Sequence, residues 1–411
     1  MKALAPLLLA LLAAVSPSGA REAAPLRVGV SGDYPPFSFA SEEDPSELQG
    51  FDLAVARAYA AERELELEMV RFRWPALLAD LAADRFDLAM SGITIRPERS
   101  IAGIFTVPVI ASGAVALVRE GSGIADLESL DHPTRRIAVN QGGHLERVTR
   151  ARFPRAAVIA TPENAQVREA LLSGKADAVV SDTLEAPIWR EGRENVVQLG
   201  PFTSDLKAYL VHPDREELAA DLDAWLMARE SDGTLAGLRR RYLGHGDSPR
   251  TAEPLSALLA AVGERLDLMP LVAEAKRAAG APVGAPEQEA RVIEAALEAA
   301  REARRTAVSE RSVRRFFEVQ IAAAKEIQRT TLAGPAGTAP PADLETALRP
   351  ALMRLARRIA LLTQRLPAQI DRRDLEARAR ERLRTPGLSE GARGALVEAI
   401  LALPEPRHDL P

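Results

Sequence analysis

Short apolar runs alternate with amphipathic segments along the first half of the chain. Continuous apolar runs of roughly four to eight residues are typical of buried strands, whereas apolar residues spaced three or four apart indicate helices. In order, strand, helix, strand, helix and strand are predicted over 26–30, 51–62, 65–72, 74–83 and 86–90. This alternation predicts a mostly parallel sheet, whose binding sites lie beyond the carboxyl ends of the strands.

A second alternating set follows residue 107. Its expected strands are 113–118, 136–139, 157–159, 176–180 and 207–211. Its expected helices begin at His144 and then cover 216–228 and 235–242. We therefore expect two α/β lobes with a cleft between them: lobe 1 over about 26–108 and 207–245, and lobe 2 over about 109–206.

The strand signals stop at about Ser248, and Ala, Leu, Glu and Arg dominate the rest of the chain with a helical period. The expected helices are 254–279, 286–305, 309–331, 344–366, 372–384 and 389–401, with a Gly/Pro-rich loop at 334–341. The chain is thus predicted to be multidomain. A two-lobed α/β domain over 21–247 precedes an all-α domain over 248–411.

The chain has 411 residues, 47% of them hydrophobic, and a formal net charge of -5 that leaves no basic footprint for nucleic acid. Residues 1–20 have the charged, apolar and small-residue zones of a signal peptide, and their apolar run is too short to span a bilayer. We expect cleavage near Ala20 and a periplasmic protein with no membrane attachment afterwards. A tethering signal anchor is the alternative.

Residues 91–100, after the strand 86–90, form the first candidate site. Small residues after a strand expose backbone N–H groups, and a guanidinium can bind a planar carboxylate through two parallel hydrogen bonds. Ser91, Thr94 and Arg99 are therefore candidates for a carboxylate clamp. The alternative is a surface turn with a solvated arginine, in which Pro97 only starts a short helix.

The clamp and two further motifs carry a family resemblance. The motifs are Gly32-Asp33-Tyr34-Pro35-Pro36-Phe37, Gly50-Phe51-Asp52-Leu53-Ala54 and Ser91-Gly92-Ile93-Thr94 with Arg99. On these residues, about 26–245 resembles the family 3 periplasmic solute-binding proteins. The resemblance implies a two-lobed, type II periplasmic-binding-protein-like fold, in which Thr94 and Arg99 hold a ligand carboxylate.

Other segments resemble the catalytic branch of that family, the cyclohexadienyl dehydratases. They are Trp74, 140–143 with Glu146 and Arg147, 181–185 and 207–210. The resemblance implies prephenate as substrate, and arogenate stays open as a second one. Trp74 would form an apolar wall against the substrate ring, although a tryptophan that opens a helix also suits a core.

Prephenate loses carbon dioxide and its ring hydroxyl together, and hydroxide leaves poorly unless it is protonated. A carboxylic acid that burial keeps neutral can supply that proton. Glu185 is the candidate catalytic acid. The alternative is a helix capping box formed by Asp182 and Glu185. Pro187, which favours the first helical turn, argues for a later helix start and leaves Glu185 free to face the cleft.

Five more side chains are candidate substrate contacts, each with a structural alternative. Asn140 and Gln141 can donate to a second carboxylate or to the hydroxyl, or can form an ordinary turn. Lys207 can neutralise a carboxylate or be a solvated edge lysine. Asp33 and Asp182 resemble positions that meet an amino or hydroxyl group, or cap turns.

We expect no metal and no other cofactor. The five histidines are scattered without metal-ligand spacing, at His132, His144, His212, His245 and His408. No Ser/Cys nucleophile motif is present, and the chain has no cysteine.

The all-α half resembles the exported branch of the AroQ-class chorismate mutases over about 252–403. The resemblance rests on 261–266, Lys276, 282–283, 316–317 with Gln320, Lys325 and Gln328, and Asp343, Leu344 and Arg349. It implies that Arg265 and Arg349 bind carboxylates of chorismate, while Lys276 and Gln328 face the ether oxygen. The rearrangement needs a folded substrate and well-placed cations, and no nucleophile or proton shuttle.

Two positions depart from the mutase pattern. Gln288 stands where the family has an arginine, and Ala285 stands where an acid is common. Arg291, one helical turn after Gln288, is a candidate substitute. Without one, the loss of a preorganised donor weakens transition-state stabilisation by about 3 kcal/mol.

Together the two resemblances imply an exported bifunctional enzyme that makes prephenate from chorismate and converts it to phenylpyruvate. One alternative is a transporter's binding protein for an amino acid or another carboxylate, since most members of the fold only bind. A second alternative keeps the dehydratase and makes the helices inactive. The expected partners are the small-molecule substrates alone, and a homo-oligomer is compatible with the sequence.

Overall fold

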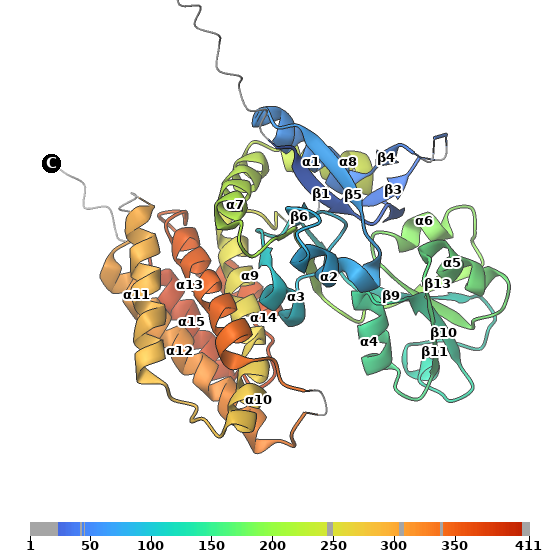
Figure 1. Ribbon diagram of the computed structural model, residues 1–411. Coiled ribbons are helices and arrows are strands. Elements are labelled where there is room, and N and C mark those ends of the chain that lie inside the picture. Colours follow the sequence, from blue (N-terminus) through green and yellow to red (C-terminus); the bar gives the residue numbers. More distant parts are fainter. Residues whose placement is uncertain are drawn as a thin grey trace, which may run out of the picture.

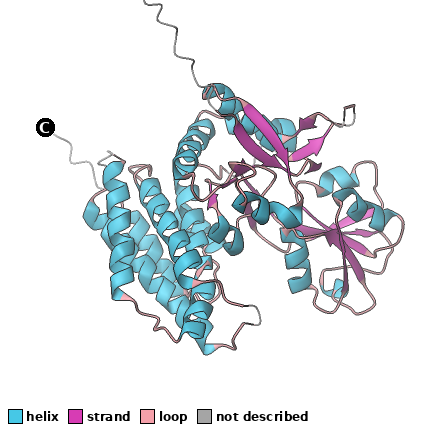
Figure 2. Ribbon diagram, viewed as in Figure 1, coloured by secondary structure: helices cyan, strands magenta, loops and turns pink. Residues whose placement is uncertain are grey.

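The computed structural model describes residues 24–41, 43–44, 46–244, 250–303, 308–337 and 340–404. The predicted signal peptide lies outside these residues. Within them, no helix combines the length and apolar character needed to cross a bilayer. The chain forms an α/β part built on two five-stranded sheets and a bundle made only of helices, which packs beside the first sheet's lobe (Figures 1 and 2).

The first sheet has the strand order β5-β1-β6-β15-β7. Its strands are β1 (Leu26–Val30), β5 (Leu67–Arg71), β6 (Leu88–Ala89), β7 (Ile104–Phe105) and β15 (Leu210–Val211). Strands β5, β1 and β6 run parallel, whereas β15 is antiparallel to β6 and β7. A small separate sheet contains β2 (Asp33–Tyr34), β3 (Ser38–Ala40) and β4 (Leu48–Gln49), which the apolar pattern did not predict.

The helices of this lobe are α1 (Phe51–Glu62), the 3-10 turn η1 (Trp74–Ala76), α2 (Leu77–Ala82), α3 (Pro97–Ala102), α7 (Glu216–Ser231) and α8 (Thr234–Leu243). Pro97 opens α3, where a missing N–H costs nothing. Gly50 precedes α1 with φ at 129°, and a Cβ there would lie 2.3 Å from the Phe37 carbonyl oxygen. Only glycine suits this close approach.

The second sheet has the order β11-β10-β12-β9-β13. Its strands are β9 (Ala114–Arg119), β10 (Arg136–Asn140), β11 (Ala157–Thr161), β12 (Ala178–Asp182) and β13 (Val196–Leu199). The helical segments of this lobe are the 3-10 turn η2 (Glu128–Leu130), α4 (His144–Arg152), α5 (Asn164–Leu172) and α6 (Ala186–Arg190). Strands β10, β11 and β12 are parallel, and β9 pairs antiparallel with β12 and β13.

A two-stranded ribbon, β8 (Ile110–Ser112) with β14 (Asp205–Lys207), carries the chain between the lobes. The predicted strand 207–211 is therefore two strands in the structure. It ends in the ribbon at Lys207 and resumes in the first sheet at Leu210. An apolar run alone does not reveal that the chain changes sheets within it.

The helical part contains α9 (Pro254–Asp267), α10 (Met269–Ala279), α11 (Pro286–Glu302), α12 (Glu310–Ala333), the π-helical turn η3 (Leu344–Leu348), α13 (Arg349–Thr363), α14 (Arg372–Arg382) and α15 (Glu390–Leu401). The helix predicted over 254–279 is interrupted at Leu268, because Pro270 has no N–H with which to continue the hydrogen-bond ladder. The helix predicted over 344–366 likewise begins as the π-helical turn.

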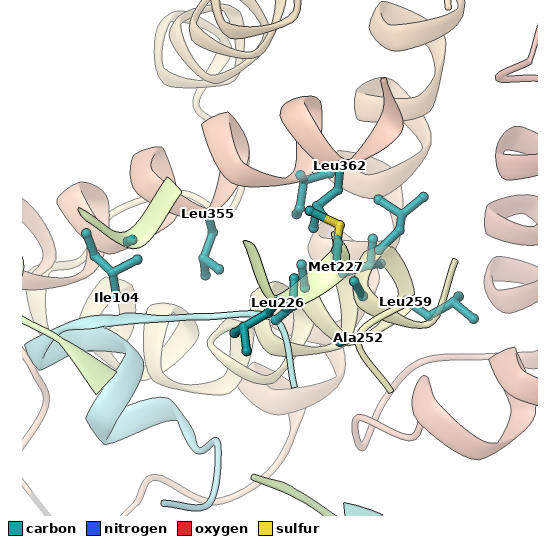
Figure 3. Close-up of a cluster of buried hydrophobic side chains, with 14 of the residues drawn as sticks. Ile104, Leu226, Met227, Ala252, Leu259, Leu355 and Leu362 are labelled. Atoms are coloured by element: carbon teal, nitrogen blue, oxygen red, sulfur yellow. The ribbon is translucent and has the colours of Figure 1, made fainter. Parts of the chain in front are cut away.

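Helices α7 and α3 of the first lobe pack against α9 and α13 of the bundle. Figure 3 shows the apolar side chains that meet there, among them Ile104, Met227, Leu259 and Leu355. Buried Arg358 adds a polar link, since its Nε lies 2.9 Å from Asp223 of α7 and its Nη1 lies 3.3 Å from Glu264 of α9. The bundle and the lobe thus share a continuous core.

Candidate active sites

A cavity of about 40 Å³ lies between the two lobes. The residues that line it are Tyr34, Trp74, Gly92, Thr94, Arg99, Asn140, Gly143, His144, Leu145, Asn164 and Lys207. Arginine and lysine supply two positive charges, and no carboxylate is among the lining residues. A cavity with this wall attracts anions.

Arg99 on α3 provides the first cation. Its side chain is 1% exposed, Nη1 donates to the Thr94 carbonyl at 2.9 Å, and Cζ lies 5.8 Å from the Trp74 ring centroid. Nε has no hydrogen-bond partner. Burial, and next the nearby Arg96, hold the pKa of Arg99 well below its usual range. A buried cation without a carboxylate favours an anionic ligand.

Ser91, the third predicted clamp residue, turns away from the cavity. It is fully buried, and its hydroxyl bonds to the hydroxyls of Ser38 at 2.6 Å and Ser31 at 2.8 Å. It also accepts the backbone N–H of Ser31 at 3.2 Å. Ser91 therefore ties β1 to the segment after β6, which corrects its predicted contact with substrate.

Lys207, at the end of β14, provides the second cation. Its Nζ lies 3.0 Å from Asp182 Oδ2 and donates to the Gly92 carbonyl and the Tyr34 hydroxyl, both at 3.1 Å. Asp182 Oδ2 also accepts a short hydrogen bond from Tyr34. Burial opposes the ionisation of Asp182, but Lys207 and these hydrogen bonds lower its pKa overall. The alternative of a solvated edge lysine is wrong, since Lys207 is only 3% exposed.

Glu185 lies fully buried beside the cavity, and its side chain is not part of the cavity wall. Oε2 accepts from Ser181 Oγ at 2.7 Å, and Oε1 accepts from Asn164 Nδ2 at 2.5 Å. Asn164 in turn lines the cavity. Burial, and next the charge of Asp182, raise the pKa of Glu185 well above its usual range. The acid is therefore held one side chain away from the cavity, in surroundings that disfavour its charged form.

Of the alternative capping box formed by Asp182 and Glu185, the structure contains only the part made by Asp182. Asp182 Oδ1 accepts the backbone N–H groups of Leu184 and Glu185, both at 2.9 Å. The side chain of Glu185 instead bonds to Ser181 and Asn164. Asp182 caps the turn before α6, while the acid itself is turned toward the cavity wall.

The remaining predicted contacts divide into two groups. Asn140 lines the cavity, is 7% exposed and has an unpartnered Nδ2, so it offers a free donor. Trp74 also lines the cavity, and its ring meets Tyr34 edge-on at 5.8 Å. Gln141 is exposed and outside the wall, which corrects its predicted contact. Asp33 borders a neighbouring hollow, where its Oδ1 is unpartnered.

A second cavity, of about 80 Å³, lies within the helical bundle. Arg265 of α9 lines it with Nε and Nη1 unpartnered, and burial lowers the pKa of Arg265 to about 10. Lys276 Nζ of α10 donates to the Val283 carbonyl at 2.6 Å and to Gln328 Oε1 of α12 at 3.0 Å. Three of the four residues predicted for the mutase site therefore line the same cavity: Arg265, Lys276 and Gln328.

Arg349, the fourth, lines the same cavity and also pairs with Glu345. Lys325 is a further cation of the wall, 2.6 Å from Glu289. Gln288 lies on the wall, but Arg291 is exposed and outside it, so Arg291 does not replace the missing arginine. Four cations and one carboxylate make this wall positive.

Comparison with known proteins assigns the first half of the chain to a family. Residues 26–245 match the model of the bacterial extracellular solute-binding proteins, family 3. The chain belongs to this family. Residues 256–329 separately match the chorismate mutase type II family. These matches, with the two-lobed α/β architecture and the following helices, confirm the predicted fold class.

Among curated proteins, a cyclohexadienyl dehydratase of Pseudomonas aeruginosa is 34% identical over 227 residues, which cover 54% of this chain and 84% of that protein. The L-cystine-binding protein TcyJ of Escherichia coli is 26% identical over 54% of this chain and 84% of its own length. A solved ancestral amino acid-binding protein, described as a precursor of cyclohexadienyl dehydratase, is 31% identical, with a TM-score of 0.50 over 53% of this chain and 95% of its own.

Three polar side chains that line the family 3 cleft were not predicted as contacts: Tyr34, His144 and Asn164. Tyr34 belongs to a motif that carried the resemblance, so its position next to Asp33 could have identified it as a residue of the cleft. His144 opens α4, and its Nε2 lies 3.1 Å from Asp205 of β14. Asn164 opens α5, and no sequence motif marks its bond to Glu185.

Proposed function

We propose that this chain is an exported bifunctional enzyme. Its helical cavity rearranges chorismate to prephenate, and its family 3 cleft converts prephenate to phenylpyruvate, carbon dioxide and water. The observation that supports the dehydratase is the fully buried Glu185 beside a cavity that Arg99 lines: burial raises the pKa of this acid well above its usual range, and simple binding needs no such acid. Export to the periplasm accords with the family and with the predicted signal peptide.

In the cleft, Arg99 binds one carboxylate of prephenate and Asn140 Nδ2 donates to the second or to the ring hydroxyl. Trp74 lies against the ring. Glu185 gives its proton to the departing hydroxyl, which leaves as water. The ring carboxylate leaves as carbon dioxide, and the electron pair of the broken carbon–carbon bond completes the aromatic ring. Glu185 is then reprotonated from solvent.

Direct transfer requires Glu185 to turn from Ser181 past Asn164 into the cavity. Catalytic hydrogen bonds are often completed only when the substrate is bound. The hydrogen bond between Asn164 and Glu185 is the contact that such a turn breaks or redirects. Asn164 therefore governs the access of the acid to the cavity.

In the helical cavity, Arg265 and Arg349 hold the two carboxylates of chorismate. Lys276 approaches the ether oxygen, and Gln328 orients the lysine through the 3.0 Å hydrogen bond. Lys325 supplies the positive charge that Gln288 cannot. Preorganised cations in a cavity are sufficient for a rearrangement that moves no proton.

Separate feeding of the two substrates tests this function. Mature protein is given prephenate alone and chorismate alone, and phenylpyruvate is followed by its absorbance in alkali. We expect phenylpyruvate from both. Tight binding of an amino acid without turnover of either substrate would instead identify a transport protein, and turnover of prephenate alone would identify an inactive helical domain.

A further inference from the structure

Helix α3 lies between the two parts of the molecule (Figure 1). It has six residues, Pro97–Ala102, and isolated helices of this length are not stable in water. Its position is therefore set by the elements that pack against it. Helix α2 and strand β7 do so within the first lobe, and α9, α13 and the turn η3 do so from the bundle. The bundle is thus part of the support of the helix that carries Arg99.

Consecutive residues of α3 face different neighbours. Arg99 lines the cavity between the lobes. Ser100 is 3% exposed and lines a small cavity at the contact with the bundle, together with Glu264 of α9 and Arg354 of α13. Successive side chains of a helix point about 100° apart. One turn of α3 therefore presents Arg99 to the cleft and Ser100 to the bundle.

Arg354 makes a polar contact with the end of α3. Its Nη2 donates to the Ile101 carbonyl at 3.2 Å. Ile101 is the next-to-last residue of the helix, where carbonyl groups have no partner within the helix itself. An arginine side chain at this end satisfies such a carbonyl. Arg354 thus holds α3 at a point two residues after Arg99.

The direction of the Arg99 guanidinium depends on the position of α3. Nη1 donates to the Thr94 carbonyl, and Nε has no hydrogen-bond partner. Thr94 lies in the segment that leads directly into α3, so this bond moves with the helix. In the part of the chain that the structure describes, no carboxylate forms a salt bridge with Arg99. A shift of α3 would therefore carry the clamp with it.

We propose that Arg354 is a positioning residue for the cleft: by holding the end of α3, it fixes the direction in which Arg99 meets a ligand carboxylate. Arg354 lies outside residues 26–245, which match family 3, so the helical half of the chain contributes to binding in the other half. This inference rests on the role of Arg99 in the proposed function.

Ligand binding without turnover tests the inference. In full-length Glu185→Gln protein, the Kd of prephenate is measured by calorimetry with and without Arg354→Met. Methionine keeps an apolar stem but cannot donate to the Ile101 carbonyl. We expect Kd to rise by about tenfold, because preorganisation is lost while every group of the cavity wall remains. In the chain with Glu185 intact, KM for prephenate should rise likewise and kcat should stay within about twofold.

Arg357→Met is the matched control on the same helix. Arg357 is exposed and pairs with Glu216 of α7 at 3.5 Å, so it joins the bundle to α7 rather than to α3. This variant should leave the Kd of prephenate unchanged. Arg354→Lys should restore most of the affinity, since lysine can donate to the same carbonyl. All three variants should keep the mutase activity and the melting temperature of their parent.

An unchanged Kd in Arg354→Met, or an equal rise in Arg357→Met, would overturn the inference. Loss of mutase activity together with the affinity, without recovery in Arg354→Lys, would overturn it as well, because it would show a general disturbance of the bundle. So would a parent that binds no prephenate. A wild-type protein that binds prephenate without turning it over, and binds it less tightly with Arg354→Met, would instead overturn the dehydratase and leave the inference standing.

Discussion

The two cavities of this chain differ in one respect that defines their chemistry. The cleft has two cations in its wall and a buried acid, Glu185, whose pKa burial raises. The helical cavity has four cations, and its single carboxylate, Glu289, is paired with Lys325. In the proposed function, one cavity therefore supplies a proton to a leaving group, whereas the other holds and polarises an anion.

The two sites also differ in the elements from which they are assembled. The cleft takes its residues from loops and helix starts in both lobes, so it depends on how the lobes meet. The helical cavity takes Arg265, Lys276 and Gln328 from three packed helices within one bundle. Substitutions at each site should consequently leave the other activity in place.

The largest effect is expected for Glu185→Gln. Glutamine keeps the size and the hydrogen bonds to Ser181 and Asn164 but has no acidic proton to give. We expect kcat for prephenate to fall by about 10³-fold, within the range for general acids. Mutase activity on chorismate, measured in the same preparation, should not change. Unchanged dehydration would remove Glu185 from its assigned role.

Lys276→Met should come next. It removes the cation at the ether oxygen while keeping the apolar stem of the side chain. The expected loss of mutase kcat is about 10²-fold, the lower scale for one preorganised donor. Prephenate turnover by the same variant serves as the control. Loss of both activities would mean misfolding rather than a local effect, and melting followed by circular dichroism distinguishes the two.

A smaller effect separates the two candidate replacements for the missing arginine. Lys325→Gln removes a wall cation and should lower the mutase kcat/KM by about tenfold. Arg291→Gln, a matched change on the exposed side of α11, should leave it unchanged. The opposite ranking would show that the cavity opens toward α11 in solution.

The smallest expected effect is a difference between the pH profiles of the two activities near neutrality. Glu185 acts in its protonated form and its pKa is raised, so dehydration should be full at low pH and fall as pH rises through that pKa. The mutase needs Lys276 charged, and burial lowers the pKa of this lysine, so its activity should fall as pH rises and should begin to fall at a lower pH than an ordinary lysine would dictate. Dehydration that increases from pH 5 to 9 would contradict the assignment of Glu185.

Apolar periodicity was sufficient to predict the fold class, because strand and helix signals alternate in one half and only helical ones occur in the other. It missed β2, β3 and β4, since strands of two or three residues have no readable period. It also missed the break at Leu268, although Pro270 was a visible cause.

Motifs led to residues that lie at or beside the two cavities, as for Arg99, Glu185 and Lys276, while their roles stay predictions. The wrong predictions concern the direction in which a side chain points. Ser91 and Gln141 lie in correct motifs, but one side chain points into the core and the other into solvent. The pairing of Lys207 with Asp182 requires strands β14 and β12 to meet at the cleft, which no local pattern specifies.

The most direct test of the central claim is a time course on chorismate alone. Wild-type protein is mixed with chorismate, and chorismate, prephenate and phenylpyruvate are quantified at intervals. We predict that prephenate appears first and that phenylpyruvate follows until it accounts for the chorismate consumed, with Glu185→Gln stopping at prephenate. Chorismate that stays unchanged, or prephenate that accumulates without phenylpyruvate in the wild type, would contradict the bifunctional account.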